Sequence, residues 1–346
     1  MVNSIIKRIY RRTIPFTLRV KIKRFRCREA MNASKICFER QETNFRDYMD
    51  ESMFDETRKA DISRNFSLLK KNGAATFPEM NISIYEKYFT RKLKIKKDPT
   101  TDLFYVLLDD GKKLFYKRGM NESSINHSFN SVSFEQDYAS PHRYLTCDQH
   151  FVGVLRSGVK HVGSREEDSF GVAESGIVID VGAAEGNFAL SVIEKASKVY
   201  IIESDAAWCE ALKHTFSPYK EKVEIIQKYL SDVSDDNNIT LNDLIKKYGI
   251  NKIDFLKMDI EGYEKQALRG GIIGDNTSFA DINKMAICTY HNPQDELEVS
   301  NFVQQFEYKS YLTNGYMYVP DSNMPPIRKA ILRAHKEQIC VASSKQ

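Results

Sequence analysis

The sequence lacks any run of about 18 apolar residues, so it predicts no membrane-spanning helix. Its first residues do not form a secretory signal, because lysine and arginine interrupt every apolar stretch there. The six cysteines are scattered and none forms a CxxC pair, which predicts neither a zinc site nor a disulfide framework. A reducing, cytoplasmic compartment is therefore the simplest expectation.

Acidic residues are absent from residues 1–28, although this segment holds ten lysines and arginines. Because the chain of 346 residues has a net charge of +4, residues 29–346 carry a net charge of −6. A mildly acidic body argues against a nucleic-acid groove, so we expect no nucleic-acid partner. The basic tail also contains apolar residues, and it is either a peripheral anchor on an anionic membrane or a solvated arm.

The length of the chain is typical of about two domains. In the N-terminal half, two apolar runs flank Asp110-Gly111, which predicts a hairpin with a type I′ turn and strands near 102–108 and 112–118. The expected divisions are a basic tail (1–45), an α+β accessory region with the hairpin (46–165), a main α/β domain (166–325) and a C-terminal tail (326–346).

From residue 176 onward, short apolar runs alternate with helical patterns. Strands buried on both faces read as continuous apolar runs, and their alternation with helices predicts a doubly wound, mostly parallel α/β sheet. The expected strands are 176–182, 198–203, 222–227, 253–259 and 284–290, with a closing pair at 308–314 and 316–320. The expected helices are 185–196, 205–216, 239–249, 263–271 and 294–306.

Ligands of such sheets bind beyond the C-terminal ends of the strands. The first candidate is the loop DVGAAEGNF, where Gly182 and Gly186 permit a sharp turn into a helix whose free N–H groups face a ligand. A NAD-type GxGxxG would require glycines where the chain has Ala184 and Asn187. The pattern DxGxAxG fits better with a turn for the carboxypropyl end of S-adenosylmethionine, although a turn without a ligand is an alternative. The expected contacts are Asp180, Gly182, Ala183, Gly186 and Asn187.

Glu203, followed by Ser204, ends the next strand about 20 residues after this loop, where an acid can accept hydrogen bonds from ribose hydroxyls. The same position is expected for NAD and for S-adenosylmethionine, so it does not separate the two cofactors. Alternatively, Glu203 supports the start of the helix near Asp205.

The stretch FLKMDIEGYE carries Asp259 and Glu261 just after a buried strand. Buried carboxylates cost free energy unless they are paired, so carboxylates placed at the end of a strand indicate a site there. Asp259 ends the strand next to the strand of the glycine loop, where a transferred group would lie. Glu261 and Glu264 could instead favour the first turn of the following helix. A metal site at Asp259 and Glu261 has no obvious third ligand by spacing, and no metal is predicted.

His291, in TYHNPQDE, follows the fifth strand and is expected opposite Asp259. Histidine is the usual general base near neutral pH, so His291 or Asp259 is the expected base. Alternatively, His291 caps the helix that begins near Gln294.

Taken together, IDVGAAEGNFAL, IIESD, YLSD, IDFLKMDIEGYEKQALRGG and ICTYHNPQDE resemble the FkbM family of S-adenosylmethionine-dependent methyltransferases over about residues 170–320. The resemblance implies a class I methyltransferase fold, a Rossmann-like sheet with a closing antiparallel strand. It also implies O-methylation of a hydroxyl, typically on a sugar or a natural product. Two other readings stay open: an NAD-linked oxidoreductase, and a non-catalytic binding protein with the same fold.

The resemblance also implies roles for individual residues. Asp259 and Glu261 would lie near the methyl group, and His142 and Arg143 belong to FEQDYASPHRY, which resembles a segment that precedes the domain in some members. The residues expected to bind the acceptor, a small molecule or a glycan, are His142, Arg143 and Tyr290. Nothing in the sequence indicates an oligomeric state. The residues implied at the adenine are Leu230, Ser231 and Asp232.

Overall fold

The computed structural model describes residues 45–46, 49–50, 54–72, 93–135, 170–273, 276–312, 316–318 and 327–336. The chain divides into two compact units, and each is described by itself. The first comprises residues 1–92, 145–160 and 317–327, and its described part includes helix α3 (Glu56–Asn72). The second comprises residues 93–144, 161–316 and 328–346. Within the described ranges, no helix has the length and apolar character needed to cross a bilayer.

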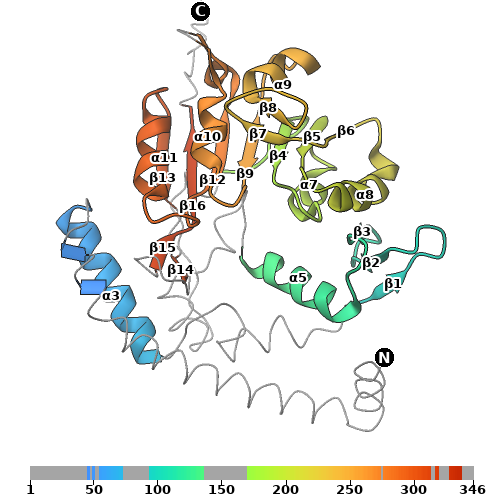
Figure 1. The fold of residues 1–346 in the computed structure, drawn as a ribbon, viewed down its shortest axis with the longest axis horizontal. Helices are drawn as coiled ribbons and strands as arrows, with labels where there is room; N and C mark the ends of the chain where they lie inside the picture. Colours follow the sequence, from blue (N-terminus) through green and yellow to red (C-terminus); the bar gives the residue numbers. More distant parts are fainter. Residues whose placement is uncertain are drawn as a thin grey trace, which may run out of the picture. The chain divides into compact units, whose positions relative to one another are not determined.

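A seven-stranded sheet forms the core of the second unit (Figure 1). Its order is β13-β16-β12-β9-β4-β5-β6, with the five strands from β12 to β6 parallel and β16 antiparallel to both of its neighbours. The predicted doubly wound class I methyltransferase fold, with an antiparallel closing strand, is confirmed. The strands are β4 (Ile177–Val181), β5 (Lys198–Ile202), β6 (Val223–Ile226), β9 (Phe255–Met258), β12 (Lys284–Cys288), β13 (Lys309–Leu312) and β16 (Ile331–His335).

Helices follow the parallel strands, as the alternating pattern predicted. Helix α9 shows why the helix boundaries could be predicted from the sequence. The Thr240 side chain accepts the N–H of Asp243 at the start of α9, and Gly249 ends the helix in a left-handed conformation (φ 62°). Apolar side chains of the strands and helices share one buried core, which includes Leu256, Met258 and Leu268. The helices are α7 (Asn187–Val192), α8 (Ala206–Thr215), α9 (Leu241–Tyr248), α10 (Glu264–Arg269) and α11 (Asp295–Gln304).

Short elements complete the description of the fold. Strands β7 and β8 form a small parallel pair, whereas β10 and β11 pair antiparallel, and β14 pairs with β15. These elements are β7 (Tyr229–Ser231), β8 (Asn238–Thr240), β10 (Ile272–Ile273), β11 (Asn276–Thr277), β14 (Tyr316–Tyr318), β15 (Ile327–Lys329) and the 3-10 helices η4 (Ser217–Tyr219) and η5 (Ser278–Asp281).

The predicted hairpin is present, but its turn differs from the prediction. Only Gly111 has a positive φ (86°), and Gly111 N–H bonds to the Leu108 carbonyl, so a three-residue loop replaces the two-residue type I′ turn. The hairpin lies beside α8 in Figure 1, where the Phe115 N–H donates to Thr215 Oγ1 at 2.9 Å. Its elements are β1 (Ile95–Lys97), β2 (Phe104–Leu107) and β3 (Lys113–Phe115), followed by α5 (Glu122–Glu135).

The C-terminal segment corrects the predicted closing pair of strands and the predicted tail over 326–346. β13 pairs with β16, not with β14, and β16 lies between β13 and β12 in the sheet. The strand was missed because its apolar run is broken by Arg333, which is fully buried and stacks over the Phe170 ring at 5.1 Å.

Candidate functional site

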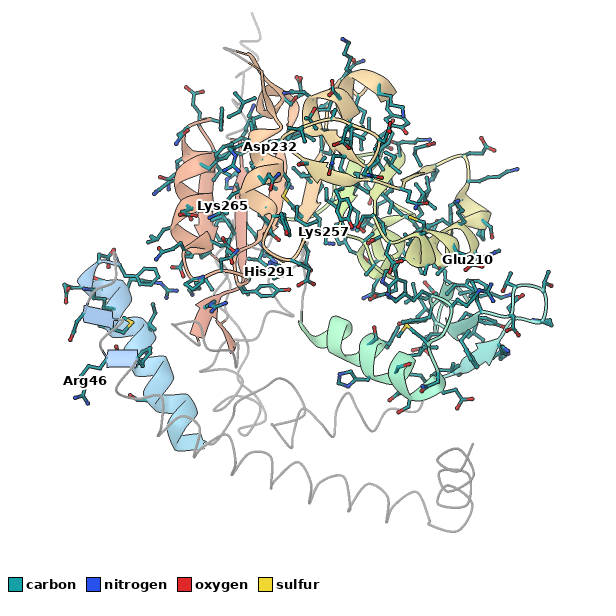
Figure 2. The ribbon with its side chains drawn as sticks, in the orientation of Figure 1. Arg46, Glu210, Asp232, Lys257, Lys265 and His291 are labelled. Carbon is teal, nitrogen blue, oxygen red and sulfur yellow. The ribbon has the colours of Figure 1, made fainter. Side chains whose placement is uncertain are left out.

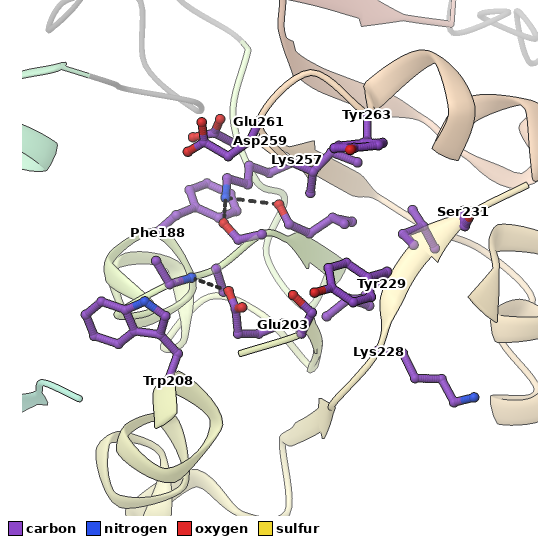
Figure 3. Close-up of a pocket in the computed structure, with 18 of the residues that line it drawn as sticks. Phe188, Glu203, Trp208, Lys228, Tyr229, Ser231, Lys257, Asp259, Glu261 and Tyr263 are labelled. Atoms are coloured by element: carbon purple, nitrogen blue, oxygen red, sulfur yellow. Dashed lines mark hydrogen bonds between the residues drawn. The ribbon is translucent and has the colours of Figure 1, made fainter. Parts of the chain in front are cut away.

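The carboxyl ends of β4 and β9 are neighbours in the sheet, and the chain leaves them toward opposite edges. This switch point is where doubly wound sheets bind ligands. A cavity of about 930 Å³ lies there (Figure 3). Ten residues predicted for the site line it: Gly182, Ala183, Asn187, Glu203, Ser204, Leu230, Ser231, Asp259, Glu261 and Tyr290.

Four other predicted residues, Asp180, Gly186, Asp232 and His291, do not line the cavity. Gly186 is structural: it begins α7 with φ 83°, and a Cβ there would collide with Leu212. Asp232 Oδ1 instead accepts a hydrogen bond from Gln266 Nε2 at 2.9 Å. The predictions for His142 and Arg143 lie outside the described residues.

Gly182 brings the loop after β4 into contact with the end of β9. It has φ 69°, and a Cβ at this position would overlap the backbone carbonyl of Asp259. Because only glycine tolerates both the left-handed conformation and this approach, the loop and Asp259 are held against the same cavity.

A buried ion pair between Lys257 and Asp180 holds the same loop in place. Lys257 Nζ lies 3.0 Å from Asp180 Oδ1 and donates to the carbonyls of Gly182 (2.6 Å) and Val181 (3.2 Å). Burial alone would lower the Lys257 pKa, but the charges of Asp180 and Asp259 outweigh it and the pKa is raised. The expectation that Asp180 faces a cofactor directly is thus corrected: its carboxylate holds Lys257, which in turn holds the loop.

Glu203 connects the loop to the end of β5. Its Oε2 accepts the N–H of Ala184 and its Oε1 the N–H of Asp205, both at 2.9 Å, and the side chain lines the cavity (Figure 3). Glu203 therefore supports the start of α8, as the alternative interpretation expected, and it also faces the cavity; its contact with a ribose stays a prediction. Each carboxylate oxygen keeps a further lone pair that can accept a ligand hydroxyl.

The other end of the cavity carries the acidic cluster. Asp259 Oδ1 accepts a hydrogen bond from Tyr290 Oη at 3.4 Å and lies 3.4 Å from His291 Nε2. His291 Nε2 lies 3.7 Å from Glu261 Oε2, and His291 Nδ1 lies 3.1 Å from Glu264 Oε1. The predicted proximity of Asp259 and His291 is thus present, with the imidazole behind the carboxylate rather than in the cavity wall.

Charge and backbone contacts hold this cluster together. Burial lowers the pKa of His291, but Glu264, Asp259 and Glu261 raise it by a larger amount, so the pKa lies above its usual value. Arg328, a residue that the sequence did not single out, donates to the carbonyls of Tyr290 (2.9 Å) and His291 (3.0 Å). The loop after β12 is therefore anchored by a buried guanidinium.

Glu185 is a second functional candidate that the sequence did not reveal. Its side chain lines the cavity but is only 3% exposed. Burial raises its pKa from 4.5 to about 7, against the lowering effects of its own backbone N–H and of Lys257, and Asp180 and Asp259 raise it further. A glutamate between Ala184 and Gly186 carries no sequence signal of burial, so only the structure identifies it.

We expect Glu185 to make the stability of the protein depend on pH. Between about pH 4.5 and 7 the folded state keeps a proton on Glu185 that the unfolded state has lost, so stability falls as pH rises, by up to ~1.4 kcal/mol per pH unit. Glu185→Gln should remove this loss, and its advantage over wild type in urea denaturation should grow across that window. Glu194→Gln, at an exposed position, is the control, and parallel pH curves for Glu185→Gln and wild type would contradict the expectation.

Comparisons with known proteins agree with this class of fold. Residues 181–309 match the model of the Methyltransferase FkbM domain. A curated relative, "Probable ribosomal RNA small subunit methyltransferase A" of Methanococcoides burtonii, is 40% identical over 79 residues, which are 23% of this chain. The match spans about a quarter (27%) of the length of that relative.

Solved structures show more distant similarity. The methyltransferase FkbM from Methylobacillus flagellatus KT is 19% identical, with 62% of this chain and 56% of that chain covered and a TM-score of 0.37. M. capricolum TrmK in complex with S-adenosylhomocysteine is 12% identical, with 48% and 65% covered and a TM-score of 0.34.

The strand order and the cavity at the switch point fit a class I methyltransferase domain, and the match to the FkbM domain model gives S-adenosylmethionine as its cofactor. The match of residues 181–309 to the Methyltransferase FkbM domain model confirms the resemblance predicted from the sequence.

Proposed function

We propose that the protein is an S-adenosylmethionine-dependent O-methyltransferase that acts on a hydroxyl of a sugar, a glycan or a related metabolite. The observation that carries this proposal is the single cavity that joins the Gly182 loop, Glu203 and Asp259. The glycine loop supplies backbone N–H groups, Glu203 supplies acceptors for ribose hydroxyls, and Asp259 supplies negative charge at the far end.

The lining residues fit the cofactor. Glu203 would accept the ribose hydroxyls, Leu230 and Ser231 would flank the adenine, and the loop at Gly182 would receive the methionine end. Bound there, the cofactor supplies a methyl group on a positively charged sulfur. Asp259 would stabilise that charge, because a carboxylate attracts a cation strongly where water is largely excluded.

The transfer requires an acceptor oxygen in line with the methyl group. The oxygen would form a bond to the methyl carbon while the carbon–sulfur bond breaks, and the sulfur would keep the electron pair of that bond. The hydroxyl proton would pass to Asp259, the carboxylate that lines the cavity, with His291 and Glu261 beside it. Alignment of the reacting atoms supplies most of the rate, and proton removal contributes about 10²–10⁴-fold.

A small or glycan acceptor is favoured over a nucleic acid by the net charge of the chain outside its basic tail. Residues 29–346 carry a net charge of −6, which repels a phosphate backbone. Tyr263, 64% exposed, and Tyr229, 60% exposed, both line the cavity and offer aromatic surface to a ligand of either class.

Titration calorimetry and a product assay together test the function. The protein should bind S-adenosylmethionine and not NAD, and it should form S-adenosylhomocysteine only when a hydroxyl acceptor from a panel of sugars, glycans and RNAs is present. Preferential NAD binding would favour an oxidoreductase, and cofactor binding without turnover on any acceptor would favour a binding protein. Turnover on RNA alone would contradict the proposed acceptor class.

Glu203→Gln should weaken S-adenosylmethionine binding by about 1–3 kcal/mol, because a charged acceptor of the ribose hydroxyls is lost. The amide still accepts one backbone N–H, which limits damage to the start of α8. Glu224→Gln on β6, outside the cavity lining, is the matched control. Equal affinities for wild type and Glu203→Gln in titration calorimetry would remove Glu203 from the cofactor site.

We propose further that residues 1–28, which lie outside the described residues, hold the enzyme at the cytoplasmic face of a membrane. Each cation near an anionic surface contributes about 1 kcal/mol, so replacing Lys21, Lys23, Arg24 and Arg26 by glutamine should abolish sedimentation with phosphatidylserine vesicles at low salt. Cofactor affinity should stay unchanged. If wild-type protein does not sediment with such vesicles at low salt, the proposed membrane anchor is wrong.

A further inference from the structure

Three side chains with metal-ligating groups converge at the acidic end of the cavity. Asp259 follows β9, Glu264 begins α10, and His291 follows β12; Figure 2 labels His291 and Figure 3 labels Asp259. One ligand atom from each of the three lies within 4.8 Å of the others. Adjacent ligands at about 2.1 Å from an octahedral ion stand about 3 Å apart, and His291 Nδ1 and Glu264 Oε1 are 3.1 Å apart.

One oxygen of this cluster is buried without a hydrogen-bond partner. Glu264 is 1% exposed, yet its Oε2 makes no hydrogen bond, whereas its Oε1 accepts the N–H of Ile260 and lies 3.1 Å from His291 Nδ1. A buried polar atom left unpaired costs about 1–3 kcal/mol, so each such atom in a folded protein calls for an explanation. A cation bound beside Glu264 would satisfy this oxygen.

The charges of the cluster also favour a cation. Asp259, Glu261 and Glu264 surround His291, and Asp295, 1% exposed, lies in the electrostatic field of Glu264. Lys265 pairs with Asp295 at 3.8 Å and also with Glu298, outside the group around His291. A divalent ion would offset two of the surrounding negative charges.

We propose that Asp259, Glu264 and His291 bind a divalent first-row metal ion at the acidic end of the cavity. The imidazole favours a first-row transition ion over Mg²⁺ and Ca²⁺, and Mn²⁺ is a suitable probe because it also accepts carboxylate oxygens. The carboxylates provide the negative charge that a hard ion requires, and the imidazole, anchored through the Arg328 contacts to its loop, provides the nitrogen.

The binding of the ion does not depend on the proposed function, but the role assigned to it does. An ion at this position would take the acceptor hydroxyl oxygen as a further ligand and lower the pKa of that hydroxyl. The proton would then pass to the Asp259 oxygen that does not bind the ion, and the transfer step balances as before. The acceptor would then have to be a molecule that can bind a metal ion, such as one with a hydroxyl next to a second oxygen.

Electron paramagnetic resonance with Mn²⁺ alone tests the site. Wild-type protein should bind one Mn²⁺ ion below about 1 mM, the weak end of the range for protein sites built from oxygen ligands. Glu264→Gln and His291→Gln should each weaken binding at least tenfold. Glu298→Gln, a carboxylate on α11 outside the cluster, should bind Mn²⁺ as wild type does.

Three results would overturn the metal site: no Mn²⁺ binding by wild-type protein, unchanged binding in both ligand variants while circular dichroism confirms their fold, or equal weakening in Glu298→Gln. S-adenosylmethionine binding is measured on the same samples by calorimetry. Cofactor binding without Mn²⁺ binding rejects the metal site and keeps the proposed function. Mn²⁺ binding without cofactor binding rejects the proposed function and keeps the metal site.

Discussion

Replacing Asp259 by asparagine should lower the rate of a single methyl-transfer turnover by about 10²–10⁴-fold, the usual contribution of a general base. The carboxylate lines the cavity, bonds to Tyr290 and contacts His291, whereas the amide can neither accept the hydroxyl proton nor neutralise the sulfonium charge. Cofactor affinity should fall as well, so the rate is measured at saturating S-adenosylmethionine.

The control for this variant is Asp232→Asn, which changes an aspartate at the opposite end of the site that does not line the cavity. It should transfer methyl groups at close to the wild-type rate once the cofactor is saturating. A full-speed Asp259→Asn enzyme would exclude Asp259 as the base and would leave His291 or Glu261 for that role.

Replacing Lys257 by methionine should destabilise the protein by about 3–5 kcal/mol, because it leaves Asp180 buried without its counter-charge. Asp180 is 0% exposed, and Lys257 also holds the carbonyls of Val181 and Gly182. Urea denaturation measures the loss, and the loosened loop should also weaken cofactor binding.

Two further variants separate this effect from a general intolerance of substitution. Lys252→Met, at a side chain 63% exposed, should change stability by no more than about 0.5 kcal/mol. Adding Asp180→Asn to Lys257→Met removes the unpaired charge and should restore part of the loss. If the double variant is as unstable as the two single losses added together, the ion-pair account is wrong.

The parallel strands were predictable because each is a short apolar run followed by a helical pattern with readable caps, as at Thr240 and Gly249. The grouping of the strand ends was also predictable, because parallel strands bring their carboxyl ends to one edge of the sheet. This is why Gly182, Glu203 and Asp259 could be assigned to one cavity from sequence alone.

The parts that escaped prediction depend on charges buried by tertiary contacts. Arg333 breaks the apolar run of β16, and Lys257 stands inside an otherwise apolar strand, so neither pattern shows that the charge is enclosed. Asp180 was assigned to the ligand because the sequence cannot show that Lys257, 77 positions further along the chain, lies 3.0 Å from it. Glu185 is hidden for the same reason, because its burial comes from the closure of the loop.

Glu264 is the most instructive case at the candidate site. From sequence it is a typical acid of a first helical turn, and in the structure its Oε1 does accept the N–H of Ile260. The same carboxylate also meets His291, which follows a different strand, so a third group joins Asp259 and the imidazole. The spacing of residues along the chain could not show that Glu264 lies beside His291. The two side chains come together because β9 and β12 are neighbouring strands of the sheet.

The central claim is that this cavity transfers a methyl group from S-adenosylmethionine to an oxygen. The most direct test is one turnover with S-adenosylmethionine carrying a deuterated methyl group, followed by mass spectrometry of the acceptor. The account predicts a labelled methyl group on a hydroxyl oxygen with wild-type protein and a rate about 10²–10⁴-fold lower with Asp259→Asn. Label on nitrogen or carbon, or equal rates with the two proteins, would contradict it.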